Sequence, residues 1–299
     1  MVQHQESSAL DRSVSLDDEE IPEAERGLTD KEQSEVREAQ RPRAPVVYEI
    51  IRLEGESELK RPIASLWWSG VAAGISIGFS FLSQAALAAG LPQSQWNHIL
   101  TSLGYSVGFI IVILGRQQLF TENVLTAVLP VITRWKVSWF LRMLRLWGVV
   151  LAANVLGCFV FACAFALLPM LSDQVTGEMA KLVETLMRNS AWEMFAKGIG
   201  AGWLIASLVW ILASVSSGQF LVIGLLTYLI SLLQFTHIVA GTAEVLYGWL
   251  AGFLTFYDAS VKFFLPTLAG NVFGGTILFS VLSYGQVREE IFEERTDYR

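Results

Sequence analysis

The chain has 299 residues, of which 53% are hydrophobic and only 16% charged, with 10 Trp and 18 Phe. This composition excludes an ordinary soluble domain and indicates an integral membrane protein whose first partner is the lipid bilayer. The formal net charge of −7 is concentrated in the two ends of the chain, so it predicts neither an acidic docking surface nor a nucleic acid partner.

Both ends of the chain are polar. Residues 1–45 are rich in Glu, Asp, Ser, Gln and Arg, which predicts a disordered acidic tail. They lack a basic segment followed by an apolar run, so no signal peptide is expected. Residues 46–61 form a juxtamembrane segment, for which a short amphipathic helix on the membrane surface and a plain linker are both open. Residues 62–285 are the predicted six-helix membrane domain, and residues 286–299 are a charged tail.

The predicted membrane domain contains six long apolar stretches. Each is long enough to cross a hydrocarbon layer about 30 Å thick as a helix. The fold class is therefore all-α, with six transmembrane elements near residues 64–88, 99–132, 146–170, 195–215, 220–256 and 260–284.

The second and fifth stretches are too long for one straight helix, because a helix rises about 1.5 Å per residue. Each contains a similar polar interruption around a Phe-Thr pair, LFTENVLTAV at 119–128 and QFTHIVAGTA at 234–243. Irregular backbone at membrane depth is tolerated where it lines a cavity, and matching broken helices in two halves are typical of inverted-repeat transporters. The sequence therefore predicts a 3+3 inverted repeat in which GRQQLFTEN (115–123) and LQFTHIVAG (233–241) are the breaks.

The distribution of basic residues predicts the orientation. The loop at 134–145 has four basic residues and no acidic one, whereas the connection at 169–194 has four acidic and two basic residues. Because cytoplasmic loops carry an excess of Lys and Arg, the 134–145 loop and both termini are expected in the cytoplasm.

His237 is the strongest candidate for a functional residue. It is the only histidine in the middle of a predicted span, and an ionisable group there is a functional candidate by default. The alternative is a neutral imidazole satisfied by Thr236 or by a free carbonyl at the break. No metal cluster, nucleophile elbow or glycine-rich phosphate loop occurs, so neither an enzyme nor a cofactor is expected.

Four segments, LGRQQLFTEN, KGIGAGWL, FTHIVAG and GNVFGG, resemble in their order the signature segments of the formate/nitrite transporter family. The resemblance covers about residues 62–285. It implies a multi-pass protein of the bacterial inner membrane with an aquaporin-like inverted repeat, assembled as a homopentamer with one pore per protomer.

The resemblance also assigns pore residues. His237 matches the pore histidine of the family, and Thr121 matches the threonine that hydrogen-bonds it from the opposing broken helix. Apolar constriction positions match Tyr105, Phe109, Ile205 and Ile230, and the two break phenylalanines, Phe120 and Phe235, are placed with them. The implied solute is a small monovalent weak-acid anion such as formate or nitrite. A bare anion cannot cheaply cross an apolar gate, but a weak acid protonated near an imidazole can.

Several charged residues lie near the expected pore mouths. Lys197 or Arg188 could draw anions into the outer vestibule, or each could snorkel to the headgroups. A carboxylate of Glu122 or Glu244 facing the pore would oppose anions unless it were protonated or paired with Arg116 or His237. The alternative is that these two glutamates face the cytoplasmic mouth or a subunit contact.

The chain departs from the family pattern at several positions. Gly202 and Gly241 stand where asparagines are common, Arg116 is an extra residue, and Gln118 stands where an acid is usual. These departures keep two other functions open: a channel for a small neutral solute or a cation on the same fold, and a non-transporting membrane scaffold whose acidic tails bind partners.

Overall fold

The computed structural model describes residues 28–92 and 94–297, and these form helices and turns without a strand. The chain divides into two units, residues 1–41 and 42–299. In the first unit the described part of the predicted disordered tail contains helix α1 (Asp30–Ala39). Thr29 begins it, because its hydroxyl accepts from the Glu32 amide while the Glu32 carboxylate accepts from the Thr29 amide at 2.8 Å. This reciprocal cap satisfies two backbone amides at the start of α1 and so stabilises a helix that has few apolar residues.

Helix α2 (Ala44–Glu58) is the juxtamembrane segment. Its apolar residues recur at helical spacing, so Val47, Tyr48 and Ile51 share one buried face. That face packs on protein, in a cluster with Leu125 and Leu129. The segment is thus a helix that packs against other helices of the second unit.

Ion pairs hold the polar side of α2 in place. The Arg134 guanidinium lies 2.6 Å from the Glu56 carboxylate, and Arg52 also contacts it. Burial disfavours the charged carboxylate, but the hydrogen bonds and charges of the two arginines outweigh that cost, so the pKa of Glu56 lies below its usual range.

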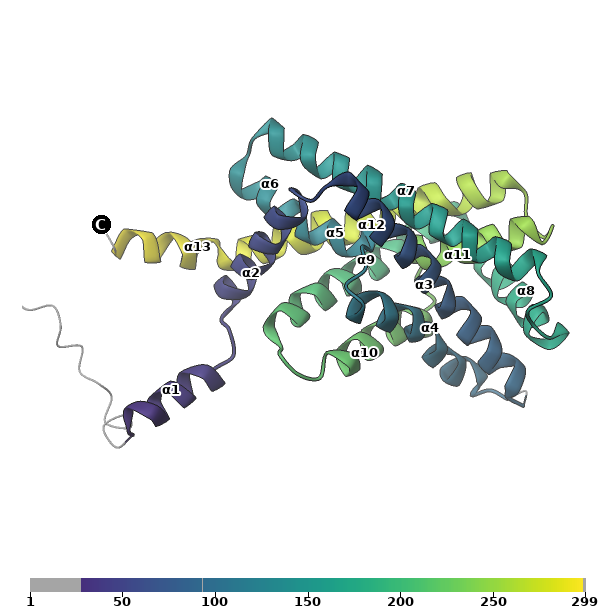
Figure 1. Ribbon diagram of the computed structural model, residues 1–299, viewed down its shortest axis with the longest axis horizontal. Helices are drawn as coiled ribbons and strands as arrows, with labels where there is room; N and C mark the ends of the chain where they lie inside the picture. Colours follow the sequence, from purple (N-terminus) through teal and green to yellow (C-terminus); the bar gives the residue numbers. More distant parts are fainter. Residues whose placement is uncertain (1–27, 93, 298–299) are drawn as a thin grey trace, which may run out of the picture. The chain divides into compact units, whose positions relative to one another are not determined.

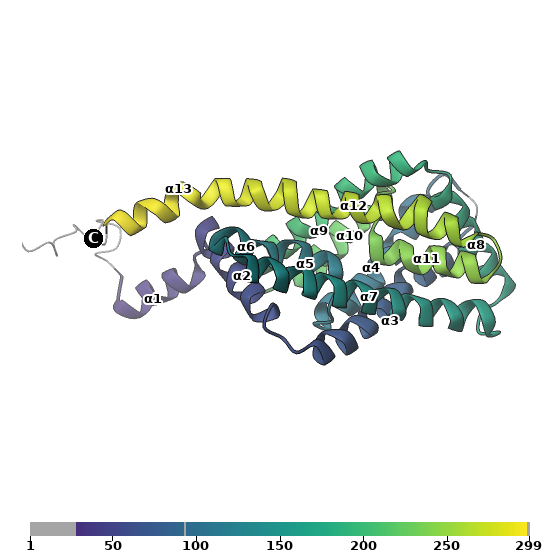
Figure 2. The ribbon, with the colours of Figure 1, turned by 90° about the horizontal axis from the view of Figure 1, so that it is seen from above.

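Among the described residues, five helices are long and apolar enough to cross a membrane. Four of the five are α3 (Ile63–Gly90), α4 (Asn97–Leu114), α7 (Val137–Leu167) and α9 (Ala191–Ser214). The fifth runs from Asp258 to Glu290 and comprises η1 (Asp258–Phe264), α12 (Leu265–Val272), η2 (Phe273–Ser280) and the first part of α13 (Val281–Asp297). Helices α3 and α7 lie side by side in Figure 1, and Figure 2 shows the fifth as one continuous helix through α12 and α13.

Shorter helices complete the two overlong apolar stretches. Non-helical turns separate α4 from α5 (Phe120–Thr126) and α10 (Gln219–Leu232) from α11 (Ile238–Leu250), while α6 (Val128–Arg134) follows α5. Arg116 and Gln234 each end the preceding helix with a left-handed φ of 53°. The next amide in each turn then donates back into that helix at 2.9 Å, Gln117 to Val112 and Phe235 to Ile230. The two turns therefore have the same backbone design.

Helix α8 (Asp173–Met187) lies within the connection expected at 169–194. Its buried side chains are Met179 and Val183, four residues apart, and the helix packs on α3 and α11. An amphipathic helix of this kind needs a partner surface, which α3 and α11 provide here.

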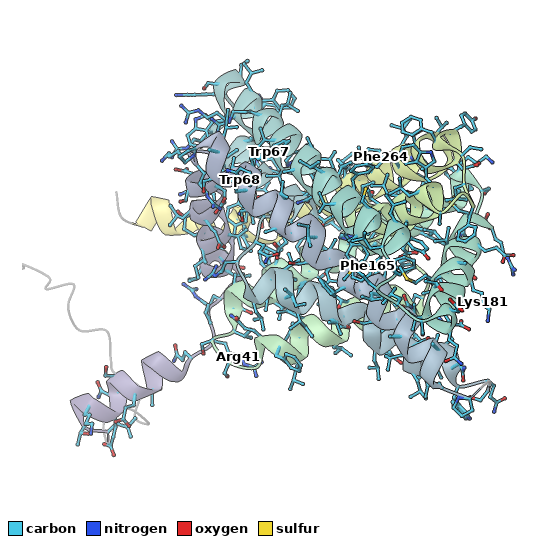
Figure 3. All side chains as sticks on the ribbon, turned by 45° about the vertical axis from the view of Figure 1, so that its right-hand side comes forward. Arg41, Trp67, Trp68, Phe165, Lys181 and Phe264 are labelled. Atoms are coloured by element: carbon cyan, nitrogen blue, oxygen red, sulfur yellow. The ribbon has the colours of Figure 1, made fainter. Side chains whose placement is uncertain are left out.

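Close glycine contacts join the long helices in pairs. A Cβ on Gly74 of α3 would lie 2.2 Å from the Asn154 carbonyl of α7, and one on Gly202 of α9 would lie 2.3 Å from the Asn271 carbonyl of α12. Side chains at these positions are excluded, so the backbones approach directly. The rings of Phe79 on α3 and Phe165 on α7, with centroids 6.3 Å apart, continue the first contact (Figure 3).

Candidate functional site

A buried asparagine of α7 holds the first turn in place. The Asn154 side-chain oxygen accepts from the Phe120 amide at 2.9 Å, and its nitrogen donates to the carbonyls of Gly70 at 2.9 Å and Gln118 at 2.8 Å. One fully buried side chain therefore satisfies the start of α5, the turn before it and a carbonyl of α3.

A second asparagine, on α12, does the same for the second turn. The Asn271 side-chain oxygen accepts from the Ile238 amide at 2.8 Å, and its nitrogen donates to the carbonyls of Gly198 and Thr236, both at 2.9 Å. Asn271 is in the quoted GNVFGG segment, and Asn154 is a polar residue inside an apolar run, but neither was among the predicted site residues. A mid-span amide is the signal that could have found both.

The two turns can be aligned by their hydrogen bonds to Asn154 and Asn271, and this alignment differs from the one that the repeated Phe-Thr pair gives in the sequence. In hydrogen bonding, Gln118 corresponds to Thr236 and Phe120 corresponds to Ile238, so Leu119 occupies the position equivalent to His237. The matching of Phe120-Thr121 with Phe235-Thr236 in the sequence is therefore three residues out of register. The two Phe-Thr pairs are therefore similar in sequence but do not occupy equivalent positions in the two turns.

The two turns bring Thr121 and His237 together. Thr121 Oγ1 lies 2.7 Å from His237 Nε2, and the imidazole is 1% exposed. His237 Nδ1 accepts from the Ala240 amide at 3.2 Å, so the side chain also caps the start of α11. Because an amide can only donate, we assign the proton to Nε2, which donates to Thr121. Phe109 presents its ring edge-on to the imidazole, with centroids 5.0 Å apart.

Of the predicted apolar gate residues, Phe109 contacts this pair through His237. Phe109, Ile205 and Ile230 are fully buried, and Tyr105 is nearly so. The rings of Tyr105 and Phe109 lie 5.3 Å apart. Tyr105 also lines a cavity, whereas Phe109 lies beyond it, against His237.

That cavity, which we call the α8-side cavity, has a volume of about 110 Å³. It reaches the imidazole of His237 from the direction of α8. The main polar groups of its lining are Gln84, His98, Tyr105, Asn189, Ser231, Gln234 and Glu244, and its apolar lining includes Leu182, Leu186, Phe235 and Phe263.

A second cavity, which we call the α2-side cavity, has a volume of about 660 Å³. Helix α2 contributes Glu54 and Glu58 to its lining, and the first turn and α5 contribute Arg116, Gln118 and Glu122. Neither cavity shares a lining residue with the other. The Thr121–His237 pair lies between them, since His237 lines the first cavity and Glu122, next to Thr121, lines the second.

The two candidate glutamates thus lie in different cavities, Glu244 in the α8-side cavity and Glu122 in the α2-side cavity. Neither carboxylate makes a hydrogen bond or an ion pair with any described residue. Arg116 does not pair with Glu122. It lies 3.4 Å from Glu54 of α2 and is 86% exposed.

The predicted vestibule cations are not equivalent. Lys197 Nζ lies 2.6 Å from Oδ1 of Asn189, which lines the α8-side cavity. Arg188 instead pairs with Glu184 at 2.9 Å, one helical turn away, and its side chain is 72% exposed. It lies beside Phe253 in a separate surface hollow, so it is not part of the site.

The two break phenylalanines also separate. Phe235 lines the α8-side cavity and packs over Gly200, where a Cβ would lie 2.5 Å from its ring. Phe120 is buried against Trp147, with ring centroids 5.8 Å apart, and lines neither cavity. The reason is the register difference, which turns Phe120 toward α7.

Steric contacts explain why glycines, and not asparagines, stand at positions 202 and 241. No side chain fits at Gly202, which contacts the Asn271 backbone, and a Cβ on Gly241 would lie 2.3 Å from the ring of Phe263. Phe263 is fully buried and lines the α8-side cavity, so an aromatic ring lies where an amide side chain at position 241 would have to fit.

A chain of polar side chains in the α8-side cavity was not predicted. Gln84 Nε2 donates to Ser231 Oγ at 2.8 Å, and Ser231 donates to Ser102 Oγ at 3.1 Å. Ser102 donates to the His98 carbonyl at 2.7 Å. The chain crosses α3, α10 and α4, and only the packing of these three helices brings its members together.

The sequence is similar to a family of known membrane proteins. A sequence model of the family described as "Formate/nitrite transporter" matches residues 45–285. The chain is 43% identical over 253 residues to the inner membrane protein YfdC of Escherichia coli (strain K12), covering 85% of this chain and 82% of that protein. It is 25% identical over 240 residues to the uncharacterized transporter YrhG of Bacillus subtilis (strain 168), covering 77% of this chain and 88% of the relative.

Two solved structures have a similar fold. A pentameric formate channel with formate bound superposes with a TM-score of 0.66 at 21% identity, covering 76% of this chain and 97% of the channel. An FNT family ion channel superposes with a TM-score of 0.65 at 19% identity, covering 82% and 96% of the two chains. At these identities the structures show the fold alone. The match to the family over most of the chain shows more, and this protein belongs to the formate/nitrite transporter family, a family of membrane transporters and not of enzymes.

Proposed function

We propose that this protein is a transmembrane channel or transporter for small monovalent weak-acid anions of the formate or nitrite kind. The observation that carries the proposal is the buried Thr121–His237 hydrogen bond of 2.7 Å, which lies between two separate cavities. A solute passing between the cavities has to cross this pair and the apolar side chains around it.

The proposed architecture is a 3+3 inverted repeat of six spans. The second span is α4 with α5 and α6, the fifth is α10 with α11, and each is broken at its non-helical turn. Support comes from Asn154 and Asn271, which make matching sets of three hydrogen bonds in the two halves. Two unrelated helix breaks would have no reason to share this pattern.

The proposed gate consists of Tyr105, Phe109, Ile205 and Ile230 with His237 at its centre. Transfer of an unpaired ion into such an apolar layer is very costly, whereas a neutral acid pays only for its lost hydrogen bonds. The gate would therefore pass the protonated solute in preference to the anion. Proton-coupled transport follows from this selectivity.

The proposed setting is a bacterial inner membrane, with both termini and the α2-side cavity in the cytoplasm. The support is the basic loop at 134–145 and the similarity to an inner membrane protein. We further propose a homopentamer with one pore per protomer, in line with the pentameric formate channel of the same fold. Exposed apolar side chains of α7, among them Leu141, Leu156 and Phe159, are available for lipid or a neighbouring protomer.

Solute flux tests the proposal. The purified protein in liposomes is given formate, nitrite, lactate, hydrosulfide and glycerol in turn at pH values from 5.5 to 7.5. We expect saturable entry of one or more of the anions, faster at lower pH. Entry of glycerol alone would select the neutral-solute alternative, and the absence of all flux would favour a scaffold.

One observation favours a second candidate, a channel for a neutral solute or a cation. The carboxylates of Glu122 and Glu244 line the two cavities without an ion pair to a basic side chain of the described residues, and fixed negative charge repels anions. Rubidium flux in the same liposomes separates this candidate from the first.

A further inference from the structure

We propose that Glu244, and not His237, is the group that gives a proton to the solute before it crosses the gate. This inference rests on the proposed function, and it concerns the residue that sets the pH dependence. It starts from the hydrogen bonds of the two ionisable groups that meet in the α8-side cavity.

Both nitrogens of the imidazole are already engaged. His237 Nδ1 accepts from the Ala240 amide, and Nε2 is bonded to Thr121 Oγ1. Protonation at Nδ1 would remove the cap of α11 and leave the Ala240 amide facing another donor. Loss of the Nε2 proton to a solute would require the Thr121 bond to break. The histidine is therefore built to stay neutral and to hold the two halves together.

Glu244 has the opposite character. Its half-buried side chain lines the α8-side cavity without a hydrogen bond or an ion pair to a described residue. It lies seven residues after His237 on the same helix, which is about two turns and about 10 Å along the axis. A solute that enters from the α8 end therefore meets the carboxyl group on its way to the imidazole.

No cation on the neighbouring elements neutralises this carboxylate. On α8, Lys181 pairs with Glu178 at 2.7 Å and is exposed at the edge of the bundle (Figure 3), and Arg188 pairs with Glu184. On η1, Lys262 pairs with Asp258 at 2.5 Å.

The other titratable groups of the cavity do not replace Glu244. The phenol of Tyr105 lines the same cavity as Glu244, but a phenol is a far weaker acid than a carboxyl group. His98 is exposed at the rim of the cavity, where its Nε2 lies 3.0 Å from the Leu232 carbonyl. On α9, Lys197 is held by Asn189.

The proton transfer balances without another reactant. The protonated carboxyl group of Glu244 gives its proton to the entering anion, so the O–H bond of Glu244 breaks and an O–H bond of the solute forms. The neutral acid crosses the gate and loses its proton to water in the larger α2-side cavity. Glu244 regains a proton from water at the α8 end, and each cycle moves one anion and one proton in the same direction.

The space in the cavity fits this step. A volume of about 110 Å³ exceeds several-fold the roughly 10–15 Å³ that one water requires on the same measure. A small anion and a few waters can therefore lie together beside Glu244. Phe263, which lines the same cavity opposite Gly241, keeps the volume small.

The test uses full-length protein in liposomes that contain a trapped pH-sensitive dye. Sodium formate is added outside at pH 5.5 and at pH 7.5, and the entry of formate and of protons is recorded. The variants are Glu244→Gln, Glu244→Asp and His237→Asn, with Glu184→Gln as the matched control for loss of a carboxylate at the same end of the protein.

We expect the parent and Glu184→Gln to carry formate at least five-fold faster at pH 5.5 than at pH 7.5, with proton entry. In Glu244→Gln the rates at the two pH values should differ by less than two-fold, and proton entry should be lost. Glu244→Asp should keep both the pH dependence and the proton entry. His237→Asn should keep the pH dependence but carry formate at a lower rate. An unchanged ratio in Glu244→Gln, or a lost ratio in His237→Asn, overturns the inference. Absence of flux of every anion through the parent would instead overturn the proposed function.

Discussion

Thr121 and His237 join the helices α5 and α11, which follow the two non-helical turns, through a single hydrogen bond of 2.7 Å. Each lies at the start of a helix that follows a non-helical turn, Thr121 in the first turn of α5 and His237 at the cap of α11. The two residues are 116 positions apart, so their contact depends on how both turns are held.

Removal of the threonine hydroxyl should leave the imidazole without a partner. We expect Thr121→Val to lower the free energy of unfolding by about 1–3 kcal/mol, because a buried donor loses its acceptor. Thr121→Ser keeps the hydroxyl and should cost clearly less. Thermal unfolding of both variants in the same detergent measures the difference, and equal stability of the two would show that the bond contributes nothing.

The two asparagines should be needed for the turns. We expect Asn154→Ala and Asn271→Ala each to destabilise the protein by at least about 2 kcal/mol, since each leaves several backbone groups unsatisfied. Gln95→Ala, at an exposed position, is the control. Urea or thermal unfolding in detergent checks the effect. A cost confined to one of the two variants would contradict the equivalence of the halves.

The ring of Phe109 should limit passage beside His237. We expect Phe109→Ala to raise formate flux and to admit the larger lactate, because removal of a fully buried ring opens the layer next to the imidazole. The variant should also lose about 3–5 kcal/mol of stability, as is usual for a buried Phe. Flux through Phe109→Leu provides the intermediate case, and an unchanged flux in both would place the gate elsewhere.

The contact between Glu56 and Arg134 should make the docking of α2 depend on pH. The pKa of Glu56 is lower in the folded protein than in the unfolded chain. The ion pair therefore contributes its full stabilisation above the unfolded value of about 4.3, and this contribution is lost as the pH falls through the folded pKa.

Glu56→Gln tests this dependence. At pH 7 the variant should be less stable than the parent by about 1.5–3 kcal/mol, the usual range for a hydrogen bond to a charged group, and the gap should shrink as the pH falls below 4. Thermal unfolding at several pH values measures it. A gap that stays constant with pH would mean that shape, and not charge, holds α2 in place.

The sequence alone predicted the membrane setting and the positions of the apolar helices. The long runs at 64–88 and 195–215 became α3 and α9 with small shifts at their ends, because hydropathy and length are properties of a continuous stretch of chain. The two non-helical turns after α4 and α10 lie in stretches of more than thirty apolar residues, which are too long to cross a membrane as one straight helix.

Other features were not visible along the chain. Helix α8 was expected only as a connection, because its apolar face is short and gains its stability from α3 and α11. The three-residue register error at the Phe-Thr pairs has a related cause. Sequence similarity compares side chains, whereas the turns are aligned by backbone groups that Asn154 and Asn271 satisfy from other helices.

The sequence by itself thus determined which segments are apolar, which of them are too long for one straight helix and which ionisable residues they contain. The tertiary structure decided what those residues contact: His237 is engaged at both nitrogens, Arg188 faces away, and Glu244 lines a cavity without a hydrogen-bond or ion-pair partner among the described residues. The physical reason is that hydrophobicity is local to a segment, whereas a hydrogen bond or an ion pair between helices depends on the packing distance and rotation of both helices.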